Sequence, residues 1–288
     1  MKKLLTTLCL VLLSVHSYSQ EISISQLVER QGIKYEINST IPFTGTVTHS
    51  EYFGWISQRI NYKDGKLDGV WEEYHNDIPG EVLRKRSNWI NGELHGVTET
   101  YTFNIVTDRG VLTERSNWIN GELHGVTETY TFNIENYHLT NRRVLIKRET
   151  FRNGKLDGPY ESYFPNGQLD YRGNWKNEKE EGLFETFYEN GQLEYRGNYI
   201  GDIREGLSEW FYENGQLKSK RNYKNGKRDG LEEGYYENGQ LKSKGNYKDG
   251  KQDGLFERYH ENGQLEYKTN FKDGIQDGLV ERYDENGL

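Results

Sequence analysis

The chain is poor in cysteine, proline and long apolar runs, and each shortage excludes a class of protein. Its 288 residues include one cysteine, Cys9, and four prolines. Because a disulfide needs two cysteines, the chain cannot form an internal disulfide framework. After residues 4–15, no apolar run approaches the roughly 20 residues that a helix needs to cross a bilayer. Hydrophobic residues make up only 33% of the chain, so a large conventional core is not expected.

Charge and aromatic content narrow the class further. The formal net charge is −8, which disfavours anionic lipid and predicts no nucleic-acid partner. Such a polar composition is typical of disorder, but disordered chains are poor in aromatic residues. Here 14% of the residues are aromatic, including 22 tyrosines, and 32 glycines accompany them. The composition therefore favours short strands joined by many turns.

The N-terminus has the pattern of a secretory signal peptide. Lys2 and Lys3 precede an apolar run over 4–15, and Ser17 and Ser19 offer small residues for cleavage before Gln20. The alternative is a membrane anchor, but the run is about 12 residues and too short to span a bilayer. We predict a cleaved signal peptide at residues 1–19 and export to the periplasm, the cell surface or the medium. Cleavage leaves 35 basic and 45 acidic residues, a formal charge of −10.

The remaining chain divides into a short cap and a long array. Residues 20–44 contain Gln26–Ile37, which predicts a hairpin around Gln31-Gly32 that caps the open edge of the following sheet. Residues 45–288 are predicted to form the repeat array.

A glycine opens each unit of this array. These glycines are Gly45, Gly69, Gly96, Gly125, Gly158, Gly182, Gly206, Gly230, Gly254 and Gly278. Successive glycines are separated by 24, 27, 29 and 33 residues, and then five times by 24 residues. The segment Arg86–Ile105 recurs residue for residue as Arg115–Ile134. A fixed period in this range indicates a repeat architecture.

Alignment of the units shows positions that recur. Three residues after the glycine stands a glutamate, at Glu72, Glu99, Glu128, Glu161, Glu185, Glu209, Glu233, Glu257 and Glu281. Two residues later stands an aromatic residue, at Tyr74, Tyr101, Tyr130, Tyr163, Phe187, Phe211, Tyr235, Tyr259 and Tyr283. The second half of each regular unit carries a leucine, a basic residue, an asparagine and an aromatic residue, as in Leu265, Lys268, Asn270 and Phe271.

Turn chemistry predicts the strand register. In Pro165-Asn166-Gly167 the proline suits the second position of a type I turn, which favours a three-residue hairpin loop. The Lys248-Asp249-Gly250 turns can be interpreted in the same way. Because side chains alternate along a strand, this register places on one face Leu255, Glu257, Tyr259, Leu265, Tyr267 and Phe271. The basic residue and the asparagine, Lys268 and Asn270, then lie on the other face. The predicted fold is all-β: an elongated antiparallel β-hairpin array in one twisted sheet, with two short strands per unit of 24 residues.

Three units are longer than the others. Their extra residues fall in or beside the first loop, within His75–Glu81, Asn104–Gly110 and Asn133–Arg143. All should project from one rim of the sheet, where insertions in repeat arrays often bind partners. The alternative is that they are idle surface loops.

The segment Tyr236–Leu255 and its copies resemble the bacterial variant of the MORN repeat, the form found in antitoxin-like MORN-variant proteins. The resemblance covers roughly residues 41–288. It implies a β-hairpin array used for binding or scaffolding without catalysis, in some members as the neutralising partner of a toxin. Lipid contact has been proposed for some members of the wider family. The predicted signal peptide departs from a cytosolic antitoxin, and the acidic composition departs from a binder of anionic lipid.

No catalytic, cofactor-binding or metal-binding residues are predicted. Glutamates of successive units should lie about 10 Å apart, too far to share a metal ion, so we expect them to accept hydrogen bonds from tyrosine hydroxyls or asparagine side chains. The Asp-Gly pairs are ordinary turn residues, and His95 and His124 occupy the turn position that Asp68 fills elsewhere. The sequence contains no Ser–His–Asp set, cysteine nucleophile or phosphate-binding glycine loop, and we predict no enzyme and no cofactor.

Function is then a question of binding. The aromatic row Trp175, Tyr199, Tyr223 and Tyr247 should hold the sheet together through cross-strand pairs, or alternatively present a platform for carbohydrate or peptide. We predict a non-catalytic repeat protein that binds a partner protein or an envelope component through a sheet face or the inserted loops. One alternative is an immunity or antitoxin-like protein, and another is a structural spacer in the envelope. The sequence specifies neither the partner nor the oligomeric state.

Overall fold

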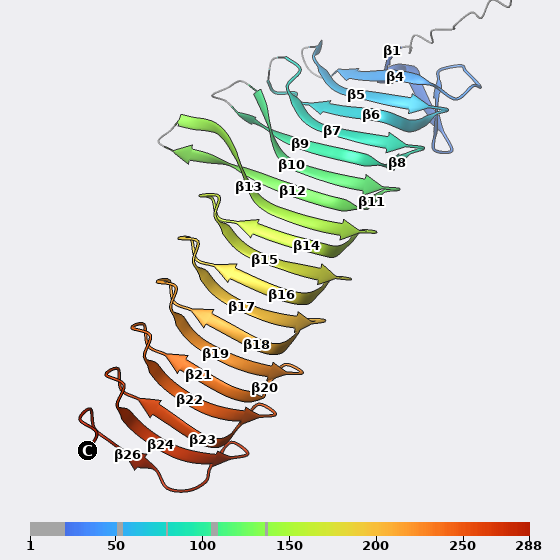
Figure 1. Cartoon of the computed structure of the whole chain (residues 1–288). Helices are drawn as coiled ribbons and strands as arrows, with labels where there is room; N and C mark the ends of the chain where they lie inside the picture. Colours follow the sequence, from blue (N-terminus) through green and yellow to red (C-terminus); the bar gives the residue numbers. More distant parts are fainter. Residues whose placement is uncertain (1–20, 51–53, 79, 105–108, 136–137) are drawn as a thin grey trace, which may run out of the picture.

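The fold is nearly all β, as predicted. The computed structural model describes residues 21–50, 54–78, 80–104, 109–135 and 138–288. One sheet contains 24 strands, and a separate sheet contains two. From β4 to β26 consecutive strands lie side by side in an elongated meander (Figure 1). No helix in these ranges is long and apolar enough to cross a membrane.

The strands are short and regular in the second half of the chain and more variable in the first half. The first half contains the 3-10 turn η1 (Ile24–Gln26) and the strands β1 (Glu21–Ser23), β2 (Leu27–Arg30), β3 (Ile33–Glu36), β4 (Gly45–Ser50), β5 (Ile56–Lys63), β6 (Lys66–Tyr74), β7 (Leu83–Ile90), β8 (Glu93–Leu94), β9 (Gly96–Asn104), β10 (Arg109–Ile119), β11 (Glu122–Leu123), β12 (Gly125–Glu135) and β13 (His138–Arg152). The second half contains β14 (Lys155–Tyr163), β15 (Leu169–Lys176), β16 (Lys179–Phe187), β17 (Leu193–Ile200), β18 (Ile203–Phe211), β19 (Leu217–Lys224), β20 (Lys227–Arg228), β21 (Gly230–Tyr235), β22 (Leu241–Lys248), β23 (Lys251–Tyr259), β24 (Leu265–Lys272), β25 (Ile275–Gln276) and β26 (Glu281–Arg282).

The N-terminal end of the sheet holds the hydrophobic core. Strand β1 pairs in parallel with β4 and extends the sheet at this edge. The hairpin expected around Gln31-Gly32 is present as β2 and β3, which form the separate two-stranded sheet. The buried apolar cluster consists of Ile22, Phe43, Val47, Ile60 and Tyr62. The predicted signal peptide at 1–19 lies outside the described residues, and the domain boundaries at 19 and 44 stay predictions.

Two kinds of turn connect the strands. The three-residue loop is confirmed: the Gly167 N–H donates to the Phe164 carbonyl and the Phe164 N–H donates to the Gln168 carbonyl, both at 2.8 Å. Pro165 therefore occupies the second position of the turn, as predicted. The same interpretation of the Lys-Asp-Gly turns was wrong. Lys248 pairs directly with Lys251, and Asp249 and Gly250 have φ of +50° and +88°, which defines a two-residue type I′ turn.

A β-bulge just after the three-residue loop overturns the predicted faces. Tyr259 pairs with Leu265, but the preceding residue Arg258 pairs with Tyr267, so Glu266 is an extra residue in its strand. Because a one-residue shift moves every later side chain to the opposite face, Glu257 now stands opposite Lys268. The prediction that Lys268 and Asn270 lie on the face opposite Glu257 was therefore wrong. The same shift recurs at Ser162/Tyr163, Thr186/Phe187, Trp210/Phe211 and Gly234/Tyr235.

The recurring glycine and asparagine belong to a second irregularity of each unit. Gly230 has φ +114°, a backbone region that disfavours side chains with a Cβ atom. The Asn222 amide nitrogen donates to the Leu231 carbonyl at 3.1 Å, beside this glycine. Asn88 makes the same bond to the Val97 carbonyl at 2.7 Å. These two asparagines are therefore bonded to backbone, and of the two expected donors to the glutamates, tyrosine hydroxyls and asparagine side chains, they are not the ones used.

In the two longest units the extra residues extend strands beyond the rim of the sheet, whereas in the other longer unit β6 ends at Tyr74 and β7 begins at Leu83. The pairing of β9 with β10 continues to Asn104 and Arg109, and that of β12 with β13 continues to Glu135 and His138. These extended hairpins project from the same rim as the three-residue loops, as predicted (Figure 1). The loop residues 105–108 and 136–137 lie outside the described ranges.

Candidate functional site

The corrected register gives the sheet two chemically different faces. One face, here called the ladder face, carries Leu255, Glu257, Tyr259, Lys268 and Asn270 and their equivalents. The opposite face, here called the aromatic face, carries Phe256, Arg258, Tyr267, Thr269 and Phe271 and their equivalents. Any binding surface formed by the sheet must be one of these two.

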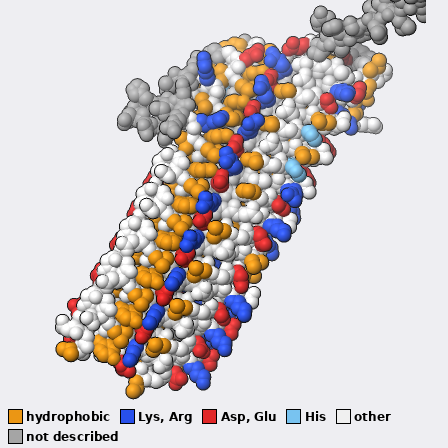
Figure 2. All heavy atoms as spheres, viewed as in Figure 1, with side chains coloured by type: hydrophobic (Ala, Val, Ile, Leu, Met, Phe, Trp, Pro, Cys, Tyr) orange, Lys and Arg blue, Asp and Glu red, His pale blue; other side chains and the backbone are white. Residues whose placement is uncertain are grey.

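A single row of alternating charges crosses the ladder face from β5 to β26. Each member is directly opposite the next on the neighbouring strand, in the order Arg59, Glu72, Arg86, Glu99, Arg115, Glu128, Arg148, Glu161, Arg172, Glu185, Arg196, Glu209, Lys220, Glu233, Lys244, Glu257, Lys268 and Glu281. Figure 2 shows this row as a stripe of alternating blue and red side chains. Because acids and bases are equal in number, the row carries no net charge, and the acidity of the chain comes from other positions.

The glutamates of this row have partners on their own face. Glu128 accepts a hydrogen bond from the Tyr130 hydroxyl at 2.7 Å, and Arg148 lies 3.0 Å away. The Tyr130 hydroxyl, opposed by partial burial and aided by Arg148, holds the pKa of Glu128 below its ordinary value. The predicted bonds from tyrosine are confirmed, and they recur at Glu72, Glu99, Glu161, Glu233, Glu257 and Glu281.

The basic half of the row was missed by sequence reasoning. Lys244 lies 2.7 Å from Glu257, and Arg196 forms an ion pair with Glu209. The wrong register had separated these residues onto opposite faces. The sequence signal that could have revealed this row is that every regular unit carries one glutamate and one basic residue at fixed positions. With their oxygens occupied, these carboxylates have little capacity left for an external cation, and the described residues contain no cluster of three or more potential metal ligands.

The aromatic face holds its rings in contact across the strands. The Phe184 ring lies 5.2 Å from the Tyr199 ring and 6.1 Å from the Trp175 ring, and its residue is only 2% exposed. The Phe256 ring lies 6.2 Å from the Phe271 ring. The expectation that the second-strand aromatics hold the sheet together is therefore confirmed for Trp175 and Tyr199. Sequence reasoning missed Phe184 and Phe256, which follow the unit glycine by two residues and were hidden by the wrong register.

One row of the aromatic face changes character along the array. This row lies near the type I′ turns. It consists of the aromatic residue of the second strand of each unit and the residue directly opposite it on the next strand. In the first half of the array Tyr62, Trp89, Trp118 and Phe151 are opposite Leu67, Leu94, Leu123 and Leu156. In the second half Trp175, Tyr199, Tyr223, Tyr247 and Phe271 are opposite Glu180, Arg204, Arg228, Gln252 and Gln276. An apolar row thus becomes a row in which rings alternate with polar, mostly planar groups.

Arginines gather in the polar half of this row. The Arg204 Cζ atom lies 5.6–5.9 Å from four ring centroids, those of Tyr195, Tyr199, Trp210 and Tyr223. Its Nε atom donates to the Tyr199 hydroxyl at 3.0 Å, and this bond, opposed by burial, raises the pKa of Arg204. Arg221 and Arg228 share one carboxylate, that of Glu232, with each contact at 3.0 Å. Arg221 also lies 4.7 Å from the Trp210 ring centroid and Arg228 lies 4.4 Å from that of Tyr247, so three guanidinium groups gather among aromatic rings here.

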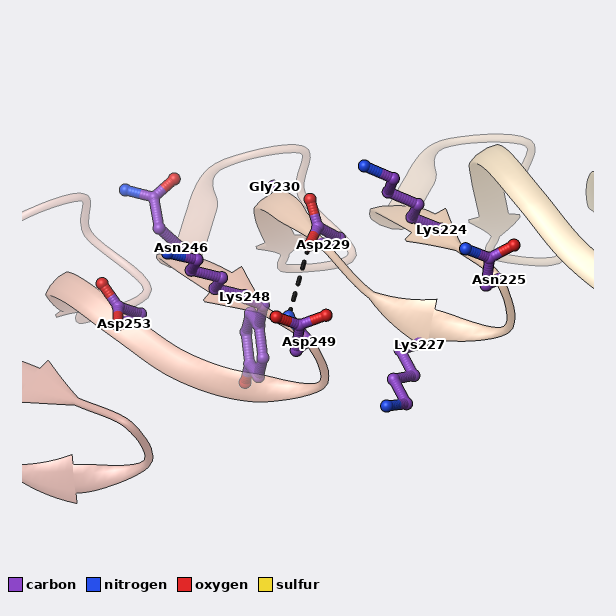
Figure 3. Close-up of a pocket in the computed structure, with 10 residues that line it drawn as sticks. Lys224, Asn225, Lys227, Asp229, Gly230, Asn246, Lys248, Asp249 and Asp253 are labelled. Carbon is purple, nitrogen blue, oxygen red and sulfur yellow. Dashed lines mark hydrogen bonds between the residues drawn. The ribbon is translucent and has the colours of Figure 1, made fainter.

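A third candidate is the cleft between successive type I′ turns. A cavity of about 560 Å³ lies between the turn at Asn225 and the turn at Asp249. Figure 3 shows the Asp229 carboxylate facing the next turn, where it accepts a bond from the Asp249 N–H at 3.3 Å. Asp68 bonds in the same way to the Asn91 N–H at 3.2 Å. The acid in this position therefore caps the following turn, as structural turn chemistry requires. His95 and His124 occupy the same position, as predicted: their N–H groups donate to the carbonyls of Asn88 and Asn117, as that of Asp229 does to Asn222.

Comparison with known proteins agrees with this architecture. The model of the MORN repeat variant family matches residues 156–177, 180–200, 204–225, 228–249 and 252–273. No curated protein matches the chain. Among 54 matching chains of solved structures are two titled "Crystal Structure of TcdB2-TccC3-Cdc42" and "Crystal Structure of TcdB2-TccC3 without hypervariable C-terminal region". The first is 13% identical with a TM-score of 0.20 and covers 86% of this chain. The second is 14% identical with a TM-score of 0.20 and covers 80%.

This chain spans only 15% and 13% of the length of those two solved chains, respectively. The family match is different in kind, since its five segments follow one another without a missing unit and each ends at a type I′ turn of the sheet. Residues 156–273 are therefore five consecutive repeats of the MORN variant family, and they form part of one continuous antiparallel sheet.

Proposed function

We propose that the protein is a non-catalytic binding repeat, exported through its signal peptide, that holds a partner protein on the aromatic face of its sheet. Repeats of this family are commonly protein- or membrane-binding modules and are generally non-enzymatic. The observation that carries the choice of face is the cluster of Arg204, Arg221 and Arg228 among aromatic rings. Arginine and large aromatic residues are the side chains most enriched at the centres of protein interfaces.

The ladder face offers less to a partner. Its charges are paired with one another, and a partner would have to replace those pairs at no net gain. The leucines that follow the unit glycine, such as Leu231 at 39% exposed, are single residues separated by about two strand spacings. The paired apolar residues of this face, such as Tyr259 opposite Leu265, lie at the rim beside the three-residue loops. The aromatic face is covered at its N-terminal end by residues 22–43, which include the β2–β3 hairpin and Phe43.

The experiment is affinity capture from cells with the tagged mature protein and matched variants. Tyr223→Ala removes a ring from the aromatic face, Leu231→Ala removes an exposed group of similar kind from the ladder face, and a third variant lacks residues 133–143. We expect one specific partner to be captured by the wild type and by Leu231→Ala and to be lost with Tyr223→Ala. Loss only in the third variant would place binding on the inserted loops and refute the aromatic face.

The same experiment separates the alternative functions. A captured toxin whose effect on cells is relieved by this protein would establish the immunity alternative. If neither the wild type nor any correctly folded variant captures a specific partner, the structural spacer is favoured.

A further inference from the structure

The polar half of the aromatic-face row has a repeat distance that selects among ligand conformations. Its rings, listed above from Trp175 to Phe271, stand on every second strand, so they recur about every 9.4–9.8 Å. A polyproline-II helix completes one turn of three residues in about 9.3 Å. One turn of such a ligand therefore matches one repeat, and the mismatch across five rings stays within about 2 Å.

Other backbone conformations fit this distance less well. Side chains of an extended strand return to the same side about every 6.6–6.8 Å, which matches neither one nor two strand spacings. Two turns of an α-helix span about 10.5–10.8 Å, so the mismatch would accumulate to about 3–6 Å across five rings. The geometry thus favours polyproline II over both alternatives.

The groups between the rings suit the backbone of that helix. A polyproline-II segment has no internal hydrogen bonds, so its carbonyl oxygens need donors from the partner. Four of the five positions opposite the rings supply donors, namely Arg204, Arg228, Gln252 and Gln276, and the fifth is Glu180, opposite Trp175. Arg228 is 40% exposed, so its donors are accessible. Aromatic-lined grooves with interspersed donors are the surfaces on which proteins bind proline-rich segments.

A hollow beside Arg204 gives the ligand a place to sit. A cavity of about 450 Å³ opens between two successive turns and is lined in part by Tyr199, Ile203, Arg204 and Lys227. Ile203 is 49% exposed and belongs to the rim of this cavity, at the turn that joins the Tyr199 strand to the Arg204 strand. A proline ring can pack on the Tyr199 ring while a carbonyl oxygen approaches the Arg204 guanidinium.

The local charge specifies the rest of the ligand. Three guanidinium groups lie between β17 and β22: Arg221 and Arg228 share the carboxylate of Glu232, and the ion pairs found among the described residues include none at Arg204. The charge of Glu180 acts on Arg204, so three positive groups face two carboxylates. In a chain of net charge −8 this is a local excess of positive charge. We propose that the row from Trp175 to Phe271 binds a proline-rich polyproline-II segment that carries an acidic side chain at each turn. This inference rests on the proposed function, because it describes what the aromatic face binds.

The test uses synthetic peptides and the full mature protein. A fluorescent 15-residue peptide of five Pro-Pro-Glu triplets is long enough to cover the row, at about 3.1 Å per residue. A peptide of five Pro-Pro-Lys triplets reverses the charge, and a peptide of five Gly-Ser-Glu triplets keeps the charge but loses the preformed helix. A chitin hexasaccharide represents the glycan alternative. Binding is measured by fluorescence anisotropy for the peptides and by calorimetry for the sugar.

We expect the Pro-Pro-Glu peptide to bind, and both control peptides and the sugar to bind at least tenfold more weakly, a difference of about 1.4 kcal/mol or more. Arg228→Gln and Tyr223→Ala should each weaken binding about tenfold, and Leu231→Ala on the ladder face should leave it unchanged. Circular dichroism of each variant confirms that it is folded, and Arg204→Lys provides a second test that keeps the charge but removes the planar group.

The inference is overturned by equal binding of the Pro-Pro-Lys or Gly-Ser-Glu peptide, by preference for the sugar, or by binding that survives both Arg228→Gln and Tyr223→Ala. Its failure can be distinguished from failure of the proposed function. If cells yield a partner that depends on Tyr223 but the Pro-Pro-Glu peptide does not bind, the aromatic face remains the binding surface and only the ligand class is wrong.

Discussion

Inversion of one charge in the ladder-face row tests whether the row acts as a continuous ladder or as separate ion pairs. In the wild type, Glu233 stands between Lys220 and Lys244, and Glu209 stands on the other side of Lys220. Glu233→Lys replaces two attractive contacts by two like-charge contacts. The double variant Lys220→Glu with Glu233→Lys restores the pair between these two positions. It also creates like-charge contacts with Glu209 and with Lys244.

The magnitude follows from the number of contacts. A favourable cross-strand charge pair contributes about 0.2–1 kcal/mol, and a like-charge pair is unfavourable by a similar amount. Reversing two contacts therefore costs about 1–4 kcal/mol. The side chains of Lys220 and Lys244 are 36% and 40% exposed, so solvent screens the interaction and the lower part of this range, about 1–2 kcal/mol, is expected. Both variants have two reversed contacts, and both should be destabilised by the same amount.

The assay is native-state hydrogen exchange of peptides that cover β19 to β22, because a repeat array opens locally as well as globally. Exchange should be faster in both variants than in the wild type, by a similar factor, and the difference should shrink in high salt. A double variant that exchanges like the wild type would refute the continuous ladder and show that the pairs act independently.

Three further predictions concern the same two faces. The bonds that lower the pKa of Glu128 make the native state bind fewer protons than the unfolded state, so stability is present above the ordinary glutamate pKa of about 4.3 and is lost as the pH falls below it through the lowered value. Thermal melts from about pH 6 to about pH 3 measure this loss. At the alkaline end, burial and the bond to Glu161 raise the pKa of Tyr163 to about 12, so its contribution is complete below about pH 10 and is lost as the pH rises toward 12, which absorbance titration of tyrosine follows. Finally, a Cβ atom at Gly173 would overlap the buried Phe184 ring, so Gly173→Ala should lower the free energy of unfolding by about 1–3 kcal/mol in urea titration.

Much of the architecture could be predicted because it depends on local chemistry. The three-residue loop follows from a proline at the second position of a type I turn and a glycine at its end, both of which are visible at Pro165 and Gly167. The period of 24 residues and the antiparallel meander follow from such turns recurring. The tyrosine–glutamate bonds follow from residues two apart on one strand, a relation that no register error can change.

The register itself could not be predicted from turn chemistry alone. The bulge at Glu266 inserts one residue after a correctly predicted loop, and no glycine or proline marks it. The criterion that apolar residues should gather on one face had favoured the wrong register. It failed because a single-layer sheet with so many polar residues has no fully apolar face. The better guide was electrostatic: only the bulged register brings each glutamate from Glu72 to Glu257 opposite a basic residue on both neighbouring strands.

The Arg204 cluster was missed for a related reason. Arg204, Arg221 and Arg228 stand at positions where other units carry glutamine, glycine or leucine, so alignment of the repeats treats them as variation. Only the three-dimensional register shows that they meet on one face beside the aromatic row. Departures from the repeat, rather than its constant positions, therefore point to the proposed binding surface.

The assignment of residues to the two faces is the central claim, and engineered cysteine pairs test it directly. Cys9 is the only cysteine of the chain and lies outside the repeat array, so no native thiol of the array can compete with an introduced cysteine pair. Directly opposite residues on antiparallel strands have Cα atoms about 4.5–5.5 Å apart, within the range that a disulfide bridges. Glu257→Cys with Lys268→Cys should therefore form a disulfide on mild oxidation, and Glu257→Cys with Tyr267→Cys should not. Efficient oxidation of the second pair and not the first would contradict the register, and with it the separation of the charge ladder from the aromatic face.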